Sequence, residues 1–383
     1  MKNFNIMTLG ASGAGKTVFL ASMYKALSIQ SNSSFKLDIQ EPQQRKLLNS
    51  TYTQILTGDT WPPGTRDISE WTFTCQVQTE TLDNYDACQF TYFDYAGGRL
   101  TDIEQEPALE EVVQRADVVL GLLDGQKIYA WLNGSDPDKT DIFLSTDLPN
   151  ILKRMQNLTV PVHFVVSKWD LLDSKFTLSQ IRAKLLTIPA FKHLVKGRSE
   201  AGSVVRLIPI SAIGLEFVTA QPDGIMTKNP GKIPCPFLVE SPISCVLPDR
   251  LQQIFREQQR KGEKLEKQIQ KGDDGNLMVN VLVGSLDILG VGLDGLGLLL
   301  EFGDFVPSTG GVRLFAKATS FANSIVKEGI RTIDKKINRT FRKKRENTLR
   351  LVKDEQSALM HAVNVFYDFE QDLMQSFPDS KIV

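Results

Sequence analysis

The residues best suited to chemistry lie near the start of the chain, where positions 10–17 read Gly-Ala-Ser-Gly-Ala-Gly-Lys-Thr. This is the G-x-x-x-x-G-K-T pattern of a loop that binds phosphate groups. An apolar run at 4–9 precedes the loop, and residues 18–24 follow it with a helical spacing of apolar side chains. The strand–loop–helix order is the context that the pattern requires, because the helix N-terminus adds a favourable partial positive charge.

The residues of this loop have separate expected roles. The glycines let backbone N–H groups turn inward on an anion. Lys16 is expected to reach the β- and γ-phosphates of a nucleotide, and the Thr17 hydroxyl is expected to bind Mg²⁺. The whole predicted phosphate-binding set is Gly10, Ser12, Gly13, Ala14, Gly15, Lys16, Thr17 and Val18.

A second motif, Ser167-Lys168-Trp169-Asp170, follows an apolar strand expected at 161–166. Guanine offers two neighbouring donors, N1–H and the exocyclic N2 amino group, and one carboxylate can accept both. Adenine has an acceptor at N1 and no amino group at C2, so Asp170 would be unpaired against it. The stem of Lys168 is expected to lie along the base. The motif therefore predicts a guanine nucleotide.

Two further motifs follow apolar strands. The strand at 203–210 ends in Ser211-Ala212-Ile213-Gly214, where the backbone N–H of Ala212 is expected to face the base oxygen. The strand at 87–93 ends in Asp94-Tyr95-Ala96-Gly97. A divalent cation between phosphates favours a hard oxygen ligand at such a strand end, which makes Asp94 a candidate. By itself, this segment also fits an ordinary turn.

In this order, the motifs resemble those of the translation-factor and Ras-like (TRAFAC) class of P-loop GTPases, over roughly residues 1–270. The loop Trp61-Pro62-Pro63-Gly64-Thr65 is most similar to the bacterial double-GTPase branch. The resemblance implies an α/β fold, a P-loop NTPase G domain with a mostly parallel sheet and helices on both faces. It also implies binding of GTP or GDP with Mg²⁺, hydrolysis of GTP, and action as a molecular switch.

The resemblance assigns further roles. Asp94 would hold Mg²⁺, and the Gly97 N–H would contact the γ-phosphate. A switch threonine would give its hydroxyl to Mg²⁺ and its N–H to the γ-phosphate; Thr65 is the first choice and Thr60 the alternative. The expected metal ligands are Thr17, Thr65 and Asp94, and the expected catalytic residues are Lys16, Thr65, Gly97 and Arg99.

The sequence departs from the family at two positions. Many of these enzymes place a glutamine after the third motif to orient the attacking water, but this chain has Gly98 there. Hydrolysis by the chain alone is therefore expected to be slow, or to use Arg99, Arg66, Glu104 or a residue of a partner. Ser167 replaces the usual Asn or Thr, and its hydroxyl is expected to make a shorter version of the same structural contact.

The remaining elements follow from apolar periodicity and turn residues. Strands are expected near 3–9, 68–79, 87–93, 117–123, 161–166 and 203–210, and helices near 15–29, 41–57, 105–115, 146–157 and 177–195. The polar stretch 124–145 is expected to be a surface loop. A helix from about 249 is expected to close the G domain, which is assigned to residues 1–271.

Residues 272–383 are expected to form an α-helical C-terminal domain. Its segment 277–306 is almost entirely apolar or glycine, but Asn280, Asp287, Asp294 and Glu301 recur every seven residues on one helical face. Acidic groups are costly in lipid. Three interpretations remain open: helices buried in a helical domain, a segment that inserts conditionally into a membrane, and a self-association surface.

A basic amphipathic helix is expected next. Residues 313–353 hold 13 Lys and Arg against 3 Asp and Glu. The basic face of this helix is expected to be exposed to solvent, to contact an anionic membrane surface through residues 277–345, or to bind an acidic protein partner. Little aromatic interleaving accompanies the charges, which argues against single-stranded nucleic acid.

Composition sets the remaining expectations. The chain has 383 residues, a net charge of −1, three histidines and four cysteines without a CxxC spacing, which argues against a zinc site. Cys75 and Cys88 are expected to be buried thiols on strands rather than a disulfide. A cytoplasmic location is expected, with association at the membrane periphery as the alternative. The expected function is a hydrolysing switch, with a partner or activator, whose nucleotide state controls the C-terminal helical domain. The alternatives are a GTP-dependent scaffold or sensor with little hydrolysis, and a membrane-associating protein gated by GTP.

Overall fold

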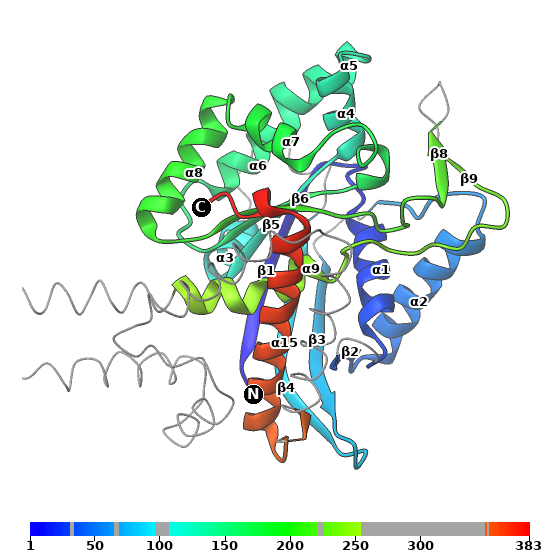
Figure 1. The fold of residues 1–383 in the computed structure, drawn as a ribbon, viewed down its shortest axis with the longest axis vertical. Helices are drawn as coiled ribbons and strands as arrows, with labels where there is room; N and C mark the ends of the chain where they lie inside the picture. Colours follow the sequence, from blue (N-terminus) through cyan, green and yellow to red (C-terminus); the bar gives the residue numbers. More distant parts are fainter. Residues whose placement is uncertain (31–33, 65–68, 96–106, 221–225, 254–348, 351) are drawn as a thin grey trace, which may run out of the picture.

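The computed structural model describes residues 1–30, 34–64, 69–95, 107–220, 226–253, 349–350 and 352–383. Within these residues the chain is an α/β fold around one seven-stranded sheet, with a separate two-stranded hairpin (Figure 1). The strands are β1 (Asn3–Gly10), β2 (Lys36–Ile39), β3 (Ser69–Gln78), β4 (Asn84–Asp94), β5 (Val118–Leu123), β6 (Val162–Val166) and β7 (Val205–Pro209), with β8 (Val218–Ala220) and β9 (Met226–Lys228) in the hairpin.

The order in the main sheet is β2-β3-β4-β1-β5-β6-β7. Strands β4, β1, β5, β6 and β7 are parallel to one another. At one side of the sheet, β3 runs antiparallel to both of its neighbours, β4 and β2. The carboxyl ends of the five parallel strands therefore meet along one edge. The first strand lies between β4 and β5, so the loop after β1 is at the point where the strand order reverses. Ligands bind at such positions in open α/β sheets.

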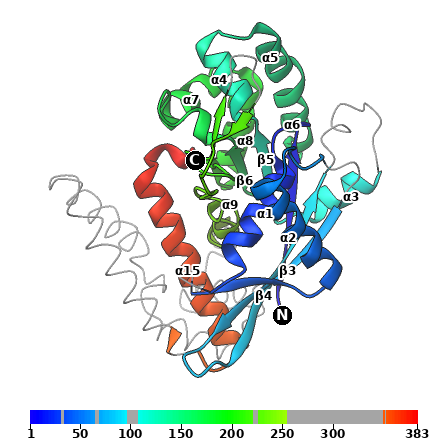
Figure 2. The same cartoon turned by 90° about the vertical axis from the view of Figure 1, so that its right-hand side faces the viewer.

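Helices cover both faces of the sheet, and the views in Figures 1 and 2 show them on either side of it. Side chains of β1 alternate between two cores, because Phe4 and Ile6 belong to one and Met7 and Leu9 to the other. The helices are α1 (Lys16–Leu27), α2 (Pro42–Thr57), α3 (Pro107–Arg115), α4 (Gly125–Asn133), α5 (Pro137–Asp141), the π-helix η2 (Ile142–Asp147), α6 (Leu148–Met155), α7 (Leu178–Leu185), α8 (Pro189–Ala201), α9 (Ser241–Ser244) and α15 (Glu355–Ser376), with short 3₁₀ turns η3 (Trp169–Leu171) and η4 (Pro378–Ser380).

All six strands expected from the sequence are present, as β1 and β3 to β7. The short edge strand β2 was not predicted, because four residues give too little alternation to identify. Cys75 and Cys88 are buried free thiols that face each other on β3 and β4, as expected.

The prediction of a surface loop at 124–145 is wrong. The segment forms α4, α5 and η2, and Ile128 and Phe143 are buried in one of the two cores. Asp124 begins α4, because its carboxylate accepts a hydrogen bond from the Gln126 N–H at 2.9 Å. Gly134 ends α4 in a left-handed conformation with φ of 66°. The polar residues that suggested a loop are therefore largely helix caps.

The single helix expected at 177–195 is two helices, α7 and α8. The break lies at Ile188, which is extended with ψ of 118°, because a residue before proline is disfavoured in the helical region. The helix expected from about 249 is present and covers residues 246–253.

The C-terminal helix α15 packs on the sheet, in contact with β3, β4 and α9. Its Phe366 packs edge-on against Phe35 and Phe90, with ring centroids 4.8 and 5.9 Å apart. Figure 2 shows the helix lying along the sheet. The described end of the predicted C-terminal domain thus shares a core with the sheet, while the boundary at 271/272 and the segments 277–306 and 313–345 lie outside the described residues. No helix in the described part is long and apolar enough to cross a membrane.

Candidate functional site

The loop after β1 has the backbone shape that its glycines predicted. Gly13 and Gly15 have φ of 79° and 88°, values that side-chain-bearing residues rarely adopt. Gly15 caps α1, and its carbonyl accepts the first helical hydrogen bond, from the Phe19 N–H at 2.8 Å. At Gly10 a Cβ atom would lie 3.0 Å from the Cβ of Leu122, so a side chain there would crowd β5.

Lys16 is folded over this loop. Its side-chain Nζ donates to the carbonyls of Gly10, at 2.7 Å, and Ala11, at 3.3 Å. The residue is only 7% exposed. Burial lowers the pKa of Lys16, and the negative charge of Asp94 opposes that shift. Asp94 ends β4 and is 2% exposed, so a buried carboxylate and a buried ammonium lie near each other beside the loop.

The segment 167–170 is joined to the end of β5. The Ser167 hydroxyl donates to the Leu123 carbonyl at 3.1 Å. Lys168 has a left-handed backbone, with φ of 52°, and its Nζ lies 2.9 Å from the Asp124 carboxylate. A Cβ on Gly125 would fall 2.1 Å from the Ser167 carbonyl, so only glycine allows this approach.

Asp170 meets the segment 211–214 directly. The Ser211 hydroxyl donates to Asp170 Oδ1 at 2.6 Å, and the Gly214 N–H donates to the Ser211 Oγ at 2.9 Å. Burial raises the pKa of Asp170, and the Ser211 hydrogen bond opposes the shift. The second carboxylate oxygen, Oδ2, is buried and has no hydrogen-bond partner among the described residues. An acceptor in this state favours a ligand that brings hydrogen-bond donors.

The four motif-bearing strand ends expected from the sequence, those of β1, β4, β6 and β7, lie at one edge of the sheet. Ser12 and Gly13 are exposed on the phosphate loop, Ala14 is buried, and Thr17 and Val18 are half-buried at the start of α1. Ala212 is half-buried beside Ser211. Thr65, Arg66, Gly97, Gly98, Arg99 and Glu104 lie outside the described residues.

The alternative switch residue, Thr60, is exposed in the loop after α2. Ser69, the first residue of β3, pairs with Asp94 across the sheet, so the chain enters β3 from the edge that holds the other motifs. This register is compatible with Thr65 as the switch threonine, which stays a prediction.

Asp124 is a site residue that the sequence reasoning missed. It follows the buried strand β5 at the same edge as the motifs, and it binds both the α4 N-terminus and Lys168. The signal was an aspartate and a glycine directly after an apolar strand.

Mg²⁺ fits the donor set at the loop after β1. The hydroxyl of Thr17 and the carboxylate of Asp94 are hard oxygen ligands, and Mg²⁺ is commonly bound by one or two protein oxygens together with phosphates and water. Within the described residues there is no group of three or more His, Cys, Asp or Glu side chains that could hold a metal alone. Phosphate oxygens would therefore have to complete the coordination.

Comparison with known proteins gives no match: neither a protein-family model nor a curated protein sequence matches this chain. Its assignment therefore depends on the residues and their geometry.

Proposed function

We propose that this protein is a P-loop GTPase of the Ras-like and translation-factor class, which binds GTP or GDP with Mg²⁺ and acts as a molecular switch. The observation that carries the proposal is the Asp170 carboxylate, buried against Ser211 with one oxygen lacking a partner among the described residues, on the edge of the sheet that holds Lys16 and Asp94. A nucleotide with donors on its base and charge on its phosphates complements both ends of this edge.

At the phosphate end, backbone N–H groups of the glycine-rich loop would cradle the phosphates. Lys16 Nζ would exchange the carbonyls of Gly10 and Ala11 for β- and γ-phosphate oxygens, a stronger partner for a buried cation. Thr17, Asp94 and Thr65 would hold Mg²⁺, which supplies charge neutralisation on the phosphates when bound.

At the base end, Asp170 would accept N1–H and the N2 amino group of guanine, with Ser211 fixing its other oxygen. Lys168, oriented by Asp124, would cover one face of the base, and the Ala212 N–H would face the base oxygen. Adenine would leave the buried Asp170 oxygen without a donor, which disfavours ATP.

The hydrolytic step would convert GTP and water to GDP and phosphate. Lys16, the Gly97 N–H, Thr65 and Arg99 would stabilise charge on the γ-phosphate. Because Gly98 offers no side chain to orient water, we propose that turnover is slow without a protein partner or activator. The same residue favours a second candidate function, a GTP-dependent scaffold that barely hydrolyses.

The nucleotide state would be read by the C-terminal helical region. The apolar and basic segments between 277 and 345 are its proposed contact with a partner, a second copy or an anionic membrane surface.

The deciding experiment is displacement of a fluorescent GDP from the full-length protein with Mg²⁺, by unlabelled GTP and separately by ATP. Competition by GTP alone is expected. Equal competition by ATP, or no binding of the probe, would refute guanine recognition.

Asp170→Asn is the matched variant, because it keeps the shape of the side chain and reverses one hydrogen-bonding group. We expect it to weaken GTP competition. Multiple-turnover phosphate release, with Lys16→Ala as the blank, then separates the hydrolysing switch from the scaffold.

A further inference from the structure

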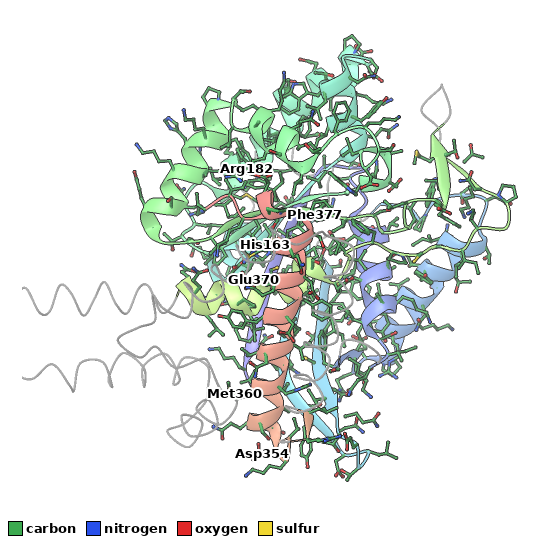
Figure 3. All side chains as sticks on the ribbon, viewed as in Figure 1. His163, Arg182, Asp354, Met360, Glu370 and Phe377 are labelled. Carbon is green, nitrogen blue, oxygen red and sulfur yellow. The ribbon has the colours of Figure 1, made fainter. Side chains whose placement is uncertain are left out.

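The last residues of the chain reach the two segments that form the base end of the site. The ring of Phe377, directly after α15, packs edge-on against Trp169, with centroids 5.8 Å apart and planes at 88°. The same ring packs against Phe237, at 6.2 Å and 76°. Figure 3 shows Phe377 at the end of α15, near Arg182.

Both aromatic partners are joined to the residues that would read guanine. Trp169 is buried and directly precedes Asp170. Its backbone N–H donates to the carbonyl of Ile210, the residue before Ser211, at 2.9 Å. Phe237 and Ser211 exchange two backbone hydrogen bonds, at 3.1 and 2.8 Å. A movement of the Phe377 ring would therefore act on both sides of the Asp170–Ser211 hydrogen bond.

Hydrogen bonds anchor the segment that carries the ring. The backbone N–H of Phe377 donates to the Leu373 carbonyl at 2.8 Å, which ties the residue to the end of α15. Beyond it, Asp379 accepts from Arg182 of α7 at 2.9 Å, and the Ile382 N–H donates to the Val205 carbonyl at 2.8 Å. These contacts attach the segment that follows the ring to α7 and β7.

We propose that Phe377 is a positioning residue for guanine recognition, which holds Trp169 and Phe237 so that Asp170 and Ser211 stay in register. The inference rests on the proposed function, since it assigns a role within the same base site. It also makes base binding and docking of the C-terminal segment reciprocal, because each stabilises the arrangement that the other needs.

The test compares GDP with inosine diphosphate, which lacks only the exocyclic amino group of guanine. The ratio of the two affinities reports the contact between that group and Asp170, whereas general damage to the fold weakens both nucleotides equally. In the wild-type protein we expect the ratio to favour GDP by about tenfold or more. Phe377→Ala should reduce the ratio by about three- to tenfold. This is the change in affinity that corresponds to the free energy of an aromatic contact.

Two variants serve as controls. Phe377→Tyr keeps the ring and should keep the wild-type ratio. Phe369→Ala removes a phenylalanine ring from α15 itself, where it packs against Phe35 at 6.3 Å, and it should leave the ratio unchanged.

A second measurement needs no substitution. Amide hydrogen exchange of residues 373–383 in the wild-type protein should slow more with GDP than with inosine diphosphate.

The outcomes separate this inference from the proposed function. If the wild-type protein prefers GDP but Phe377→Ala keeps the full ratio, or if exchange at 373–383 is the same with both nucleotides, Phe377 has no positioning role. If the wild-type protein binds no guanine nucleotide, the proposed function fails and this inference fails with it.

Discussion

Two buried cations, Lys16 and Arg206, have different direct hydrogen-bond partners. Arg206 on β7 donates to the Asp249 carboxylate at 2.5 and 2.6 Å and also to Glu370 of α15. The His163 Nε2 atom lies at hydrogen-bond distance, 2.7 Å, from Asp249 Oδ2. Lys16 instead donates to two carbonyls of its own loop. Figure 3 shows Glu370 on α15, with Phe377 at the end of the same chain segment and His163 labelled beside them.

The pKa shifts express this difference. Burial acts to lower the pKa of Arg206, but the charge of Asp249 and its neighbours outweighs burial and raises that pKa well above its ordinary value. At Lys16 burial prevails, and the pKa falls despite the charge of Asp94. A cation matched by carboxylates holds the fold together. Lys16 is supported mainly by carbonyl dipoles, so the binding of an anion would stabilise its charge more than it would stabilise that of Arg206. A buried charge without a direct counter-ion is typical of a binding site.

The largest expected effect is on stability at Arg206. Arg206→Met would leave Asp249 and Glu370 buried without their cation, and the free energy of unfolding should fall by about 3–5 kcal/mol. Urea denaturation followed by circular dichroism measures this loss.

Two controls define the cause. Arg182→Met removes an arginine from the partly exposed pair with Asp379 and should cost no more than about 1 kcal/mol. Replacing the cluster together, by Arg206→Met, Asp249→Asn and Glu370→Gln, should recover much of the loss. If Arg206→Met lowered the free energy of unfolding by no more than Arg182→Met does, the contrast between a structural Arg206 and a ligand-binding Lys16 would be contradicted.

A smaller effect, on ligand-dependent stability, is expected at Lys16. Lys16→Met removes a charge that burial disfavours, so the unfolding free energy without nucleotide should stay constant or rise slightly. The added stability from GDP and Mg²⁺, about 2.7 kcal/mol for wild type at a hundred times the Kd, should be lost.

Urea denaturation with and without GDP measures both quantities. Lys25→Met, an exposed lysine on the same helix, should change neither. Full stabilisation of Lys16→Met by GDP would contradict a phosphate-binding role.

The smallest expected effect is a loss of folding stability at low pH, which depends on the Asp249 carboxylate. Burial acts to raise the pKa of Asp249, but Arg206 outweighs it and holds that pKa well below the usual range. The resulting stability is fully present above the unfolded carboxyl pKa of about 3.9. It is lost as pH falls below that value toward the folded pKa, at up to about 1.4 kcal/mol per pH unit for one group.

Unfolding free energies of wild type and Asp249→Asn, compared between about pH 5 and about pH 3, provide the check. The difference should narrow as the pH falls. A constant difference would mean that the charge of Asp249 does not contribute.

The sequence predicted the strand ends of the site because each motif is local. Gly15 and Lys16 lie within one loop, and Ser167 to Asp170 follow one apolar strand, so periodicity and spacing identify them without the fold. Residues 124–145 were misassigned because Asp124 and Gly134 have the composition of a loop and act as caps. Asp124 had a local signal in the sequence, but its contact with Lys168, 44 positions away, is visible only in the fold.

The sequence by itself determined the strand–loop–helix order and the chemistry of the motif residues, since these depend on local spacing and side-chain type. Only the tertiary structure decided that α15 lies in the same core as β4, that Glu370 completes the cluster around Arg206, and that Phe377 packs on Trp169. These contacts join residues that are about 160 to more than 200 positions apart. Docking of α15 depends on the shape of the whole sheet, which no local pattern encodes.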